Sequence, residues 1–589
     1  MKRFVSIVLC VMLACACVPA FAAGYTAGTY TASANGNNGP VTVEVDFSDT
    51  AITAVRVTEH AETAGICDTP IERIPAAIVE NQSLAVDTVS GATNTSKAIL
   101  AAVEDCVKQA DGDVDALKTA DVAAEAVEHE DMTADVVVVG AGIAGLASSI
   151  SAAESGANVI LVEKQAVVGG SGLLTAAGFY AAETDVVPAE VETIDEMYNH
   201  ILDMIAEGGS LENVDVDRIR HLCETSPKIV EWLESLGAEF TRTSFSIKDA
   251  KEHYHILADG SNGPGQVKIL SEYAQKLGIN VMTETKCIAL KYEDGAMTGI
   301  TVSQGNTTFD INAKSVILAC GGYANNQEMM MRLAPQSLFS YTCSNAGSTG
   351  EVLQMAADLG AAWYNDQFML TCGFTSDPNS ALGMVCYPPY ASMPLVDQTG
   401  HRFANEFLLW TINSELVRNV ENAPFYGIFD SQFLKGTAAE YKYDYIEQAI
   451  ADGSPYVVKA DTLEELAAKM GIKDVDAFLE TISKYNSVKG TNDPDPEYGV
   501  PNEQLSFVEE GPFYGVLMVS LNAGTMGGIQ TQVTGEVLDI YGNVIPGLYA
   551  CGEASNGAIY DRGYISGTSV LNCYVGGRDA GSSAAAYAK

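Results

Sequence analysis

A glycine-rich segment that directly follows a run of four valines carries the clearest chemical signal in the chain. The valines are residues 136–139, and the small residues that follow in a G-x-G-x-x-G pattern are Gly140, Gly142, Ala144 and Gly145. In a strand–turn–helix unit, such glycines let the backbone approach a pyrophosphate, which then lies at the helix N-terminus. Glu163 follows the next apolar run, where an acidic side chain meets a ribose hydroxyl. The pattern predicts a dinucleotide-binding βαβ unit.

A second motif, S-G-A-T, precedes this unit and follows Asp87. Its outer residues are Ser90 and Thr93. The small residues would let a phosphate approach the backbone closely, and a helix beginning near Asn94 would direct its first N–H groups at that phosphate. The alternative is an ordinary helix cap, in which Ser or Thr satisfies the first turn.

The S-G-A-T motif resembles the target of bacterial flavin transferases in the FMN-binding domain family. That resemblance implies FMN joined covalently through its phosphate to the hydroxyl of Thr93, with Ser90 beside it. It also implies a flavin transferase as a partner. The alternating residues Val41 to Phe47 predict a half-buried strand of this domain, and residues 96–109 predict an amphipathic helix.

Further motifs follow the glycine turn in an order that resembles the fumarate reductase and succinate dehydrogenase flavoprotein family. The resemblance favours noncovalent FAD over NAD. The residues that it assigns to FAD, besides those of the first turn and Glu163, are Lys164, Gly169, Gly170, Ser171, Gly172, Gly321, Gly322, Gly552, Glu553, Thr568 and Ser569. The two-flavin layout is similar to that of secreted fumarate and urocanate reductases of this family.

These patterns predict an α/β chain of several parts: a Rossmann-like FAD-binding domain with an inserted α+β cap domain, preceded by a small α+β FMN-binding domain. The expected order is a signal peptide at 1–22, the FMN-binding domain at 24–110, a linker at 111–130, the FAD-binding domain at 131–366 and 524–589, and the cap at 367–523.

The N-terminus and the composition limit location and partners. Lys2 and Arg3, an apolar run and the sequence Ala20-Phe21-Ala22 are typical of a secretory signal peptide, so we expect a secreted or cell-envelope protein, in the periplasm or on the outer face of the cytoplasmic membrane. Lipid attachment through Cys15 or Cys17 is the alternative. The net charge of −44, from 76 acidic and 32 basic residues, argues against nucleic acid as a partner.

The thirteen cysteines do not form a metal site by spacing. No C-x-x-C pair occurs, so neither an iron–sulfur cluster nor covalent haem is expected, and no metal ligand is predicted. The spacing leaves open which cysteines could pair in an oxidising compartment.

The predicted substrate site departs from the family pattern. Trp410 stands where the resemblance places a catalytic arginine, and Gly373 and Gly524 stand where it places histidines. A dianion such as fumarate needs cationic partners, so these changes favour a larger, flatter and less charged substrate between aromatic walls. The alternative for Trp410 is packing in the cap core, with the acid moved elsewhere.

Four residues are therefore the catalytic candidates: Arg562, Tyr564, Tyr387 and Trp410. A tyrosine beside a cation could act as the general acid, and Arg562 could serve as that cation or as a carboxylate anchor.

The leading hypothesis is a flavin-dependent reductase of an activated C=C bond, an enoate or enone. Electrons would pass from a membrane or quinol-linked donor to covalent FMN, to FAD and to a small unsaturated substrate in anaerobic respiration. The alternatives are a dehydrogenase of 3-ketosteroid type, a fumarate or urocanate reductase with a rearranged site, and an electron-transfer protein without a substrate.

Overall fold

The computed structural model describes most of the chain in two compact units. The described residues are 24–119, 129–175, 178–208, 211–244, 253–335, 340–342, 344–364, 368–375, 384–386, 393–406, 416, 420–435, 444–560, 565 and 567–589. The first unit comprises residues up to 62 and 70–124, and the second comprises 63–69 and 125–589. The predicted signal peptide and residues 120–128 of the predicted linker lie outside the described residues.

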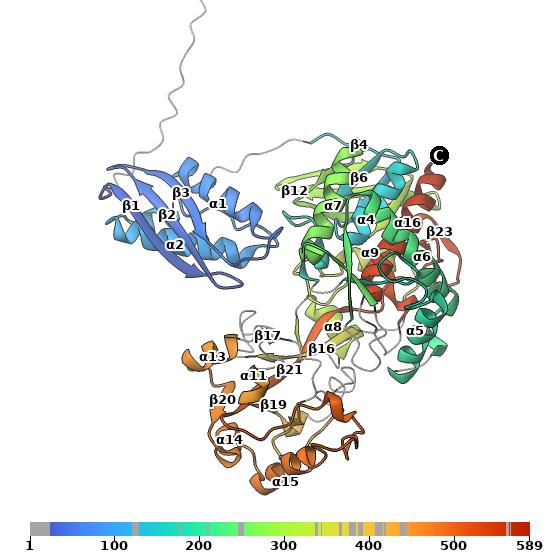
Figure 1. Cartoon of the computed structure of the whole chain (residues 1–589). Helices are drawn as coiled ribbons and strands as arrows, with labels where there is room; N and C mark the ends of the chain where they lie inside the picture. Colours follow the sequence, from blue (N-terminus) through green and yellow to red (C-terminus); the bar gives the residue numbers. More distant parts are fainter. Residues whose placement is uncertain are drawn as a thin grey trace, which may run out of the picture. The chain divides into compact units, whose positions relative to one another are not determined.

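The first unit is an antiparallel sheet with helices (Figure 1). Its strands, in sheet order, are β1 (Gly28–Asn35), β2 (Pro40–Phe47) and β3 (Ile52–Glu59), and its helices are α1 (Asp68–Asn81), α2 (Thr93–Gln109) and α3 (Val114–Thr119). On β2 the inward residues Val41, Val43 and Val45 are fully buried, as the alternation predicts. The predicted helix is also confirmed: it begins at Thr93, one residue before the expected start near Asn94 and three before the amphipathic segment 96–109.

The second unit is built on a six-stranded sheet. Its strands, in sheet order, are β10 (Asn280–Met282), β6 (Val159–Val162), β5 (Val136–Val139), β14 (Ser315–Leu318), β23 (Val544–Ala550) and β22 (Glu536–Leu538). All neighbouring pairs are parallel except β22 with β23.

The continuous valine run of β5 is explained by burial on both faces of this sheet. Val136 and Val138 pack in one core with α4 (Ile143–Glu154) and α16 (Thr568–Ala588). Val137 and Val139 pack in another core with a four-stranded sheet. That second sheet consists of β11 (Thr285–Glu293), β12 (Ala296–Gln304), β13 (Thr307–Asn312) and β4 (Met132–Thr133). Strands covered on both faces carry apolar residues at every position.

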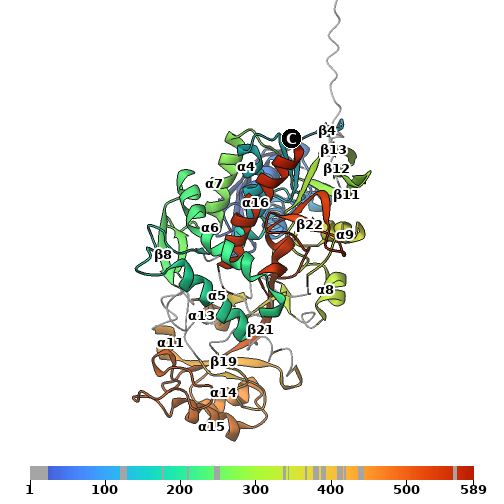
Figure 2. The same ribbon diagram turned by 90° about the vertical axis from the view of Figure 1, so that its right-hand side faces the viewer.

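Helix α16 lies against α4 because two of its glycines remove side-chain bulk (Figures 1 and 2). A Cβ atom at Gly577 would lie 2.8 Å from the carbonyl oxygen of Ala144, and one at Gly581 would lie 2.2 Å from that of Ser148. The closing helix therefore docks directly on the helix of the glycine turn.

A third sheet gathers strands from both sides of the predicted cap boundaries. In order it contains β17 (Met384–Cys386), β16 (Phe368–Thr375), β21 (Phe513–Thr525), β19 (Phe425–Asp430) and β18 (Leu395–Val396), with β15 (Tyr341–Thr342) and β20 (Val457–Ala460) also paired to β21. Helices α14 (Leu463–Met470) and α15 (Val475–Asn486) share a core with it (Figure 2). Strand β21 is continuous across residue 523, where the sequence predicts that the cap ends.

The remaining elements surround these sheets. A small sheet has the order β7 (Phe179–Tyr180), β9 (His253–Leu257), β8 (Phe240–Ser244). The helices are η1 (Gly170–Leu174), α5 (Ile194–Gly208), η2 (Leu211–Asn213), α6 (Val216–Ser235), α7 (Asn262–Lys276), α8 (Gln327–Leu333), α9 (Glu351–Asp358), η5 (Val420–Asn422), α11 (Ser431–Lys435), α13 (Asp444–Ala451), η6 (Asn502–Gln504) and η7 (Gly552–Ala558). Within the described ranges, none of the helices combines the length and apolarity needed to cross a membrane.

Candidate active site

The predicted cofactor residues meet at one edge of the six-stranded sheet. Gly140 follows β5, Glu163 follows β6, Gly321 lies just after β14, and Gly552 follows β23. Because these strands are parallel, their carboxyl ends lie together, which is where open α/β sheets bind ligands. Segments separated by about four hundred residues in sequence therefore contribute to one site.

The glycines of the first turn have different physical roles. A Cβ atom at Gly140 would lie 2.5 Å from the carbonyl oxygen of Ala319, and one at Gly145 would lie 1.8 Å from that of Gly140. These two positions permit close backbone packing. At Gly142, the N-cap of α4, a Cβ atom would meet only the carbonyl oxygen of Gly169, at 3.8 Å. The space in front of the α4 N-terminus is therefore open and suits a pyrophosphate.

Ala144 packs rather than faces this open space. It is 6% exposed, and a Cβ atom built at Gly552 would lie 2.6 Å from its Cβ. A larger residue at either position would separate α4 from the segment after β23.

The second glycine loop lies beside the first. Gly169 donates its N–H to the carbonyl of Ala141 at 2.7 Å, and Gly142 and Gly169 form a parallel bridge. Gly169 and Gly170 have φ of +117° and +54°, a region that favours glycine. The loop continues through Ser171 and Gly172 in η1. The structure therefore brings together the two loops that the sequence assigns to the same cofactor.

Glu163 is fixed with its carboxylate against the first turn. It accepts N–H bonds from Ala141 and Gln165, each at 2.8 Å, and burial raises the pKa of its carboxyl although these bonds oppose the shift. The ammonium of Lys164 contacts Thr349 and pairs with Glu351 at 3.1 Å, at the start of α9.

A buried carboxyl ties three segments together next to this edge. Glu553 accepts the N–H and hydroxyl of Thr525 at 2.8 and 3.2 Å, and burial raises its pKa. A Cβ atom at Gly322 would lie 1.9 Å from the Thr525 hydroxyl and 2.3 Å from the Glu553 carboxylate, so only glycine fits. Sequence reasoning missed Thr525 as a site residue. The only signal was its place in Thr525-Met526-Gly527-Gly528.

The start of α16 is held by side-chain hydrogen bonds within the protein. The Thr568 hydroxyl donates to the carbonyl of Ile565 at 2.6 Å and contacts the Tyr560 hydroxyl at 2.5 Å. The Ser569 hydroxyl accepts from Asn556 at 3.4 Å. Thr568 therefore anchors the turn that precedes the helix.

In the first unit, Thr93 is the first residue of α2 and is exposed. The N-cap residue Ala92 provides no side-chain hydrogen bond, so the first turn of α2 is not capped by its neighbour, contrary to the ordinary-cap alternative. Ser90 is also exposed, and Gly91 has φ of +88°. An accessible hydroxyl at an uncapped helix start fits a phosphate linked to Thr93.

The four catalytic candidates Arg562, Tyr564, Tyr387 and Trp410 lie outside the described residues. The described strands next to them show how two positions without histidine are arranged. Gly373 on β16 and Gly524 on β21 belong to one antiparallel ladder, in which Met369 faces Gly524 and Gly373 faces Val519. A Cβ atom at Gly524 would lie 3.0 Å from the Glu553 carboxylate, so this ladder borders the flavin edge.

The turn before Trp410 is held by a buried ion-pair cluster. Arg402, with a side chain 1% exposed, pairs with Glu406 at 2.6 Å and Asp495 at 2.8 Å. His401, in contrast, is exposed. Arg402 is thus engaged in the cap interior and is not free to contact a substrate.

Among the residues that the structure describes, no disulfide joins Cys67, Cys106, Cys223, Cys287, Cys320, Cys551 or Cys573, and no group of metal-ligating side chains is found. Burial raises the pKa of Cys320 and Cys573 to about 12, so these thiols near the flavin edge stay protonated at neutral pH.

Comparison with known proteins decides the family. Residues 135–570 match the FAD binding domain family, and residues 36–108 match the FMN-binding domain family. The chain belongs to the FAD binding domain family. It is an FAD-dependent oxidoreductase acting on carbon–carbon double bonds, with FAD and FMN as cofactors.

Two relatives and two solved structures illustrate the range of the family. A urocanate reductase from Eggerthella lenta is 30% identical, with 96% of this chain and 94% of the relative covered. A vinyl phenol reductase from Lactiplantibacillus plantarum is 31% identical, with 77% and 96% covered. The open conformation of a flavocytochrome c3 fumarate reductase is 28% identical, with a TM-score of 0.64 and 78% and 79% covered. A 3-ketosteroid-Δ4-(5α)-dehydrogenase from Rhodococcus jostii RHA1 is 26% identical, with a TM-score of 0.62 and 78% and 98% covered.

Proposed function

We propose that this chain is an extracytoplasmic reductase of an activated C=C bond, an enoate or enone, and that electrons reach the substrate through FMN attached to Thr93 and then through FAD. The observation that carries the proposal is the presence of two separate flavin sites in one chain. One is the open turn at Gly142, and the other is the exposed Thr93 hydroxyl at the uncapped start of α2.

Bound FAD supplies the hydride that adds to the C=C bond. The chain's own residues would hold it: the backbone at Gly142 and the start of α4 would bind the pyrophosphate, and Glu163 would accept a ribose hydroxyl. Gly321 leaves room on the flavin side, because a Cβ atom there would meet only Ser348 and Glu553, at 3.5 and 3.8 Å. Glu553, fixed by Thr525, lies beside Gly524 and would border the flavin there.

Attachment at Thr93 requires a flavin transferase acting on the exposed hydroxyl. The expected donor is a membrane or quinol-linked protein, and the expected setting is anaerobic respiration at the outer face of the cytoplasmic membrane. The charged and apolar N-terminal segment supports export, because it has the order of a secretory signal.

At the described positions of the predicted substrate site, the side chains offer little positive charge for a dianion. Gly373 and Gly524 share one antiparallel ladder and provide no imidazole. The guanidinium of Arg402 is already paired with carboxylates in the cap interior. We assign the aromatic walls to Trp410 and Tyr387. Tyr564 donates the proton to the α-carbon, with Arg562 stabilising the tyrosinate or holding a carboxylate. The relative named vinyl phenol reductase supports an aromatic, uncharged acceptor.

The test is anaerobic reoxidation of the reduced holoprotein, followed by flavin absorbance, with vinyl phenol, cinnamate, urocanate, fumarate and a steroid enone. We expect rapid reoxidation by the aromatic or enone acceptors and none by fumarate. Rapid reoxidation by fumarate would show that the site keeps a dianion clamp and that the assignment of Trp410 is wrong. No reoxidation by any acceptor would favour an electron-transfer protein.

A steroid dehydrogenase is the second candidate, favoured by the similarity to the 3-ketosteroid dehydrogenase structure. Reduction of a C=C bond and dehydrogenation of a steroid are distinguished by mixing the oxidised holoprotein with a saturated 3-ketosteroid. Bleaching of the flavin by that compound, without reoxidation by any enoate, would replace the reductase proposal.

A further inference from the structure

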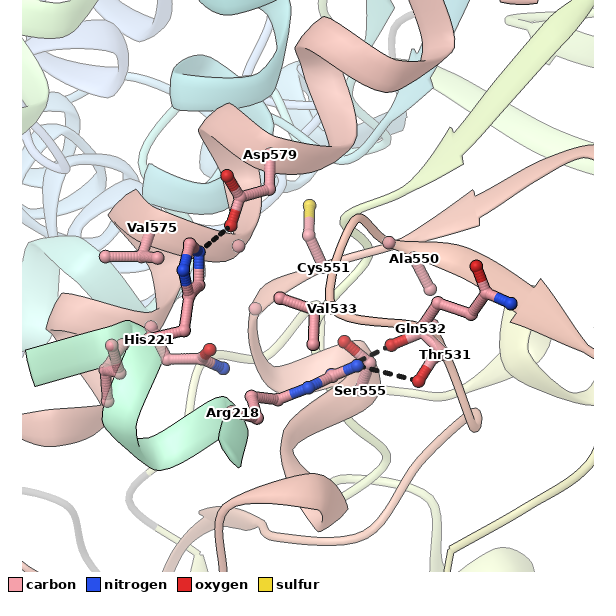
Figure 3. A pocket seen from close by; sticks show the side chains of 15 residues that line it. Arg218, His221, Thr531, Gln532, Val533, Ala550, Cys551, Ser555, Val575 and Asp579 are labelled. Atoms are coloured by element: carbon pink, nitrogen blue, oxygen red, sulfur yellow. Dashed lines mark hydrogen bonds and ion pairs between the residues drawn. The ribbon is translucent and has the colours of Figure 1, made fainter. Parts of the chain in front are cut away.

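A small polar pocket lies between α6, α16 and the segment that precedes β22, and Gly552 of the flavin edge lines one side of it. Its polar side chains are Arg218, His221, Thr531, Gln532, Ser555, Asn572 and Asp579. Figure 3 shows Arg218 and His221 on one helix, reaching toward Thr531 and Asp579 respectively. The cavity measures about 20 Å³, which admits one or two water-sized groups.

Arg218 is buried without a counter-charge. It is 9% exposed, and its guanidinium donates to the Thr531 hydroxyl at 3.0 Å and to the Thr531 carbonyl at 2.7 Å. Its Nε atom is buried and has no hydrogen-bond partner. Among the residues that the structure describes, no carboxylate lies within ion-pair distance of it. A buried charge of this kind is costly unless it is paired.

Arg402, the other arginine that is buried in the described part of the chain, is paired with carboxylates, as buried arginines usually are. Arg402 has Glu406, Asp495 and Glu497 within 3.7 Å, and both of the nearer carboxylates are buried with it. A chain with 76 acidic residues thus supplies carboxylates to a buried arginine that is purely structural. Arg218 lacks them although it lines an open pocket.

The one acid of the pocket is already engaged. Asp579 binds His221 at 2.8 Å, and this hydrogen bond raises the pKa of His221, which favours the imidazolium form. The Ser555 hydroxyl adds a neutral donor. The pocket therefore presents the Arg218 guanidinium, the His221 imidazole and the Ser555 hydroxyl beside one carboxylate that is already hydrogen-bonded.

We propose that Arg218, with His221 and Ser555, binds a small anion in this pocket, either an inorganic ion or the carboxylate end of an organic acid. The anion supplies the negative charge that Arg218 does not receive from a carboxylate among the described residues. It would join α6 and α16 to η7, which carries Glu553, so its binding stabilises the flavin edge of the holoprotein.

The test compares the wild-type holoprotein with Arg218→Met and a matched control, Arg220→Met. Arg220 lies on the same helix but pairs with Asp195 at the surface. Thermal unfolding is followed by flavin fluorescence in a buffer with only a bulky sulfonate anion. Sodium acetate, chloride or phosphate is then added at equal ionic strength.

We expect a saturable rise in Tm of about 2 °C or more for the wild type and Arg220→Met, and none for Arg218→Met. A rise with acetate alone identifies a carboxylate ligand, and a rise with chloride or phosphate identifies an inorganic one. An equal rise in all three proteins, or no saturable rise in the wild type, overturns the proposal. If Arg218→Met does not fold, calorimetric titration of the wild-type holoprotein with acetate and chloride decides alone, since absence of saturable binding contradicts the site.

Discussion

Replacing Gly142 by alanine separates cofactor binding from folding. The backbone there is extended, with φ of −72°, which alanine adopts freely, and the added Cβ would meet only one atom, at 3.8 Å. The free energy of unfolding of the apoprotein should change by about 1 kcal/mol or less, the size of an N-cap effect. The methyl group would, however, occupy the space of a phosphate oxygen beside the α4 N-terminus.

The expected loss of FAD affinity in Gly142→Ala equals the contribution of one charge-assisted hydrogen bond to the pyrophosphate. Such a bond contributes about 1.5–3 kcal/mol, which corresponds to roughly a 10- to 150-fold weaker FAD Kd, since each 1.4 kcal/mol is a factor of ten. The assay is titration of the apoprotein with FAD, followed by quenching of flavin fluorescence, with circular dichroism melting of the same samples.

The matched control is Gly145→Ala, three residues further along the same turn. Its Cβ would lie 1.8 Å from the carbonyl oxygen of Gly140, so the backbone must move, and we expect destabilisation of about 3 kcal/mol or more. Wild-type FAD affinity in a folded Gly142→Ala protein would refute the reasoning, because the pyrophosphate would then not lie at this turn.

Three further predictions concern other parts of the chain. After expression with the flavin transferase, the denatured wild-type protein should keep flavin fluorescence and show a mass increase equal to one FMN. Thr93→Ala should lose both signals, whereas Ser90→Ala should keep both; mass spectrometry of the two variants decides. The raised pKa of Glu553 means that its protonated form favours the folded state, so this stability is present below about pH 4.5 and is lost as pH rises through the higher folded pKa. Glu553→Gln should flatten that part of the Tm–pH curve, and an unchanged curve would contradict the burial argument. Arg402→Met should lower the free energy of unfolding by about 3–5 kcal/mol, because it leaves buried carboxylates unpaired. We expect faster proteolysis within residues 393–525, and an unchanged cleavage rate would count against a structural role for Arg402.

The local patterns of the sequence were sufficient for the fold around the flavin edge. The valine run of β5 predicts a strand buried on both faces, and the glycine spacing predicts the turn and helix that follow it. These features depend on backbone sterics within a few residues. The assignment of Glu163 to the end of β6 holds for the same reason.

The contacts that the sequence does not predict are long-range. Lys164 is adjacent to Glu163 in sequence, but Glu351 attracts its ammonium from nearly two hundred residues away. Thr525 binds Glu553 only because β21 ends beside η7. The Thr568 hydroxyl donates to the carbonyl of Ile565 and contacts the Tyr560 hydroxyl, which its position in the sequence does not predict. No local pattern encodes which distant partner satisfies a polar side chain.

The most direct test of the two-flavin account is electron stoichiometry. The holoprotein is reduced fully without oxygen, excess reductant is removed, and the saturated product is counted after addition of the acceptor that reoxidises it. Each C=C bond takes two electrons and each reduced flavin holds two. The account therefore predicts two equivalents of product per chain for the wild type and one for Thr93→Ala. One equivalent from both proteins would contradict it, because FMN would then not feed the substrate site.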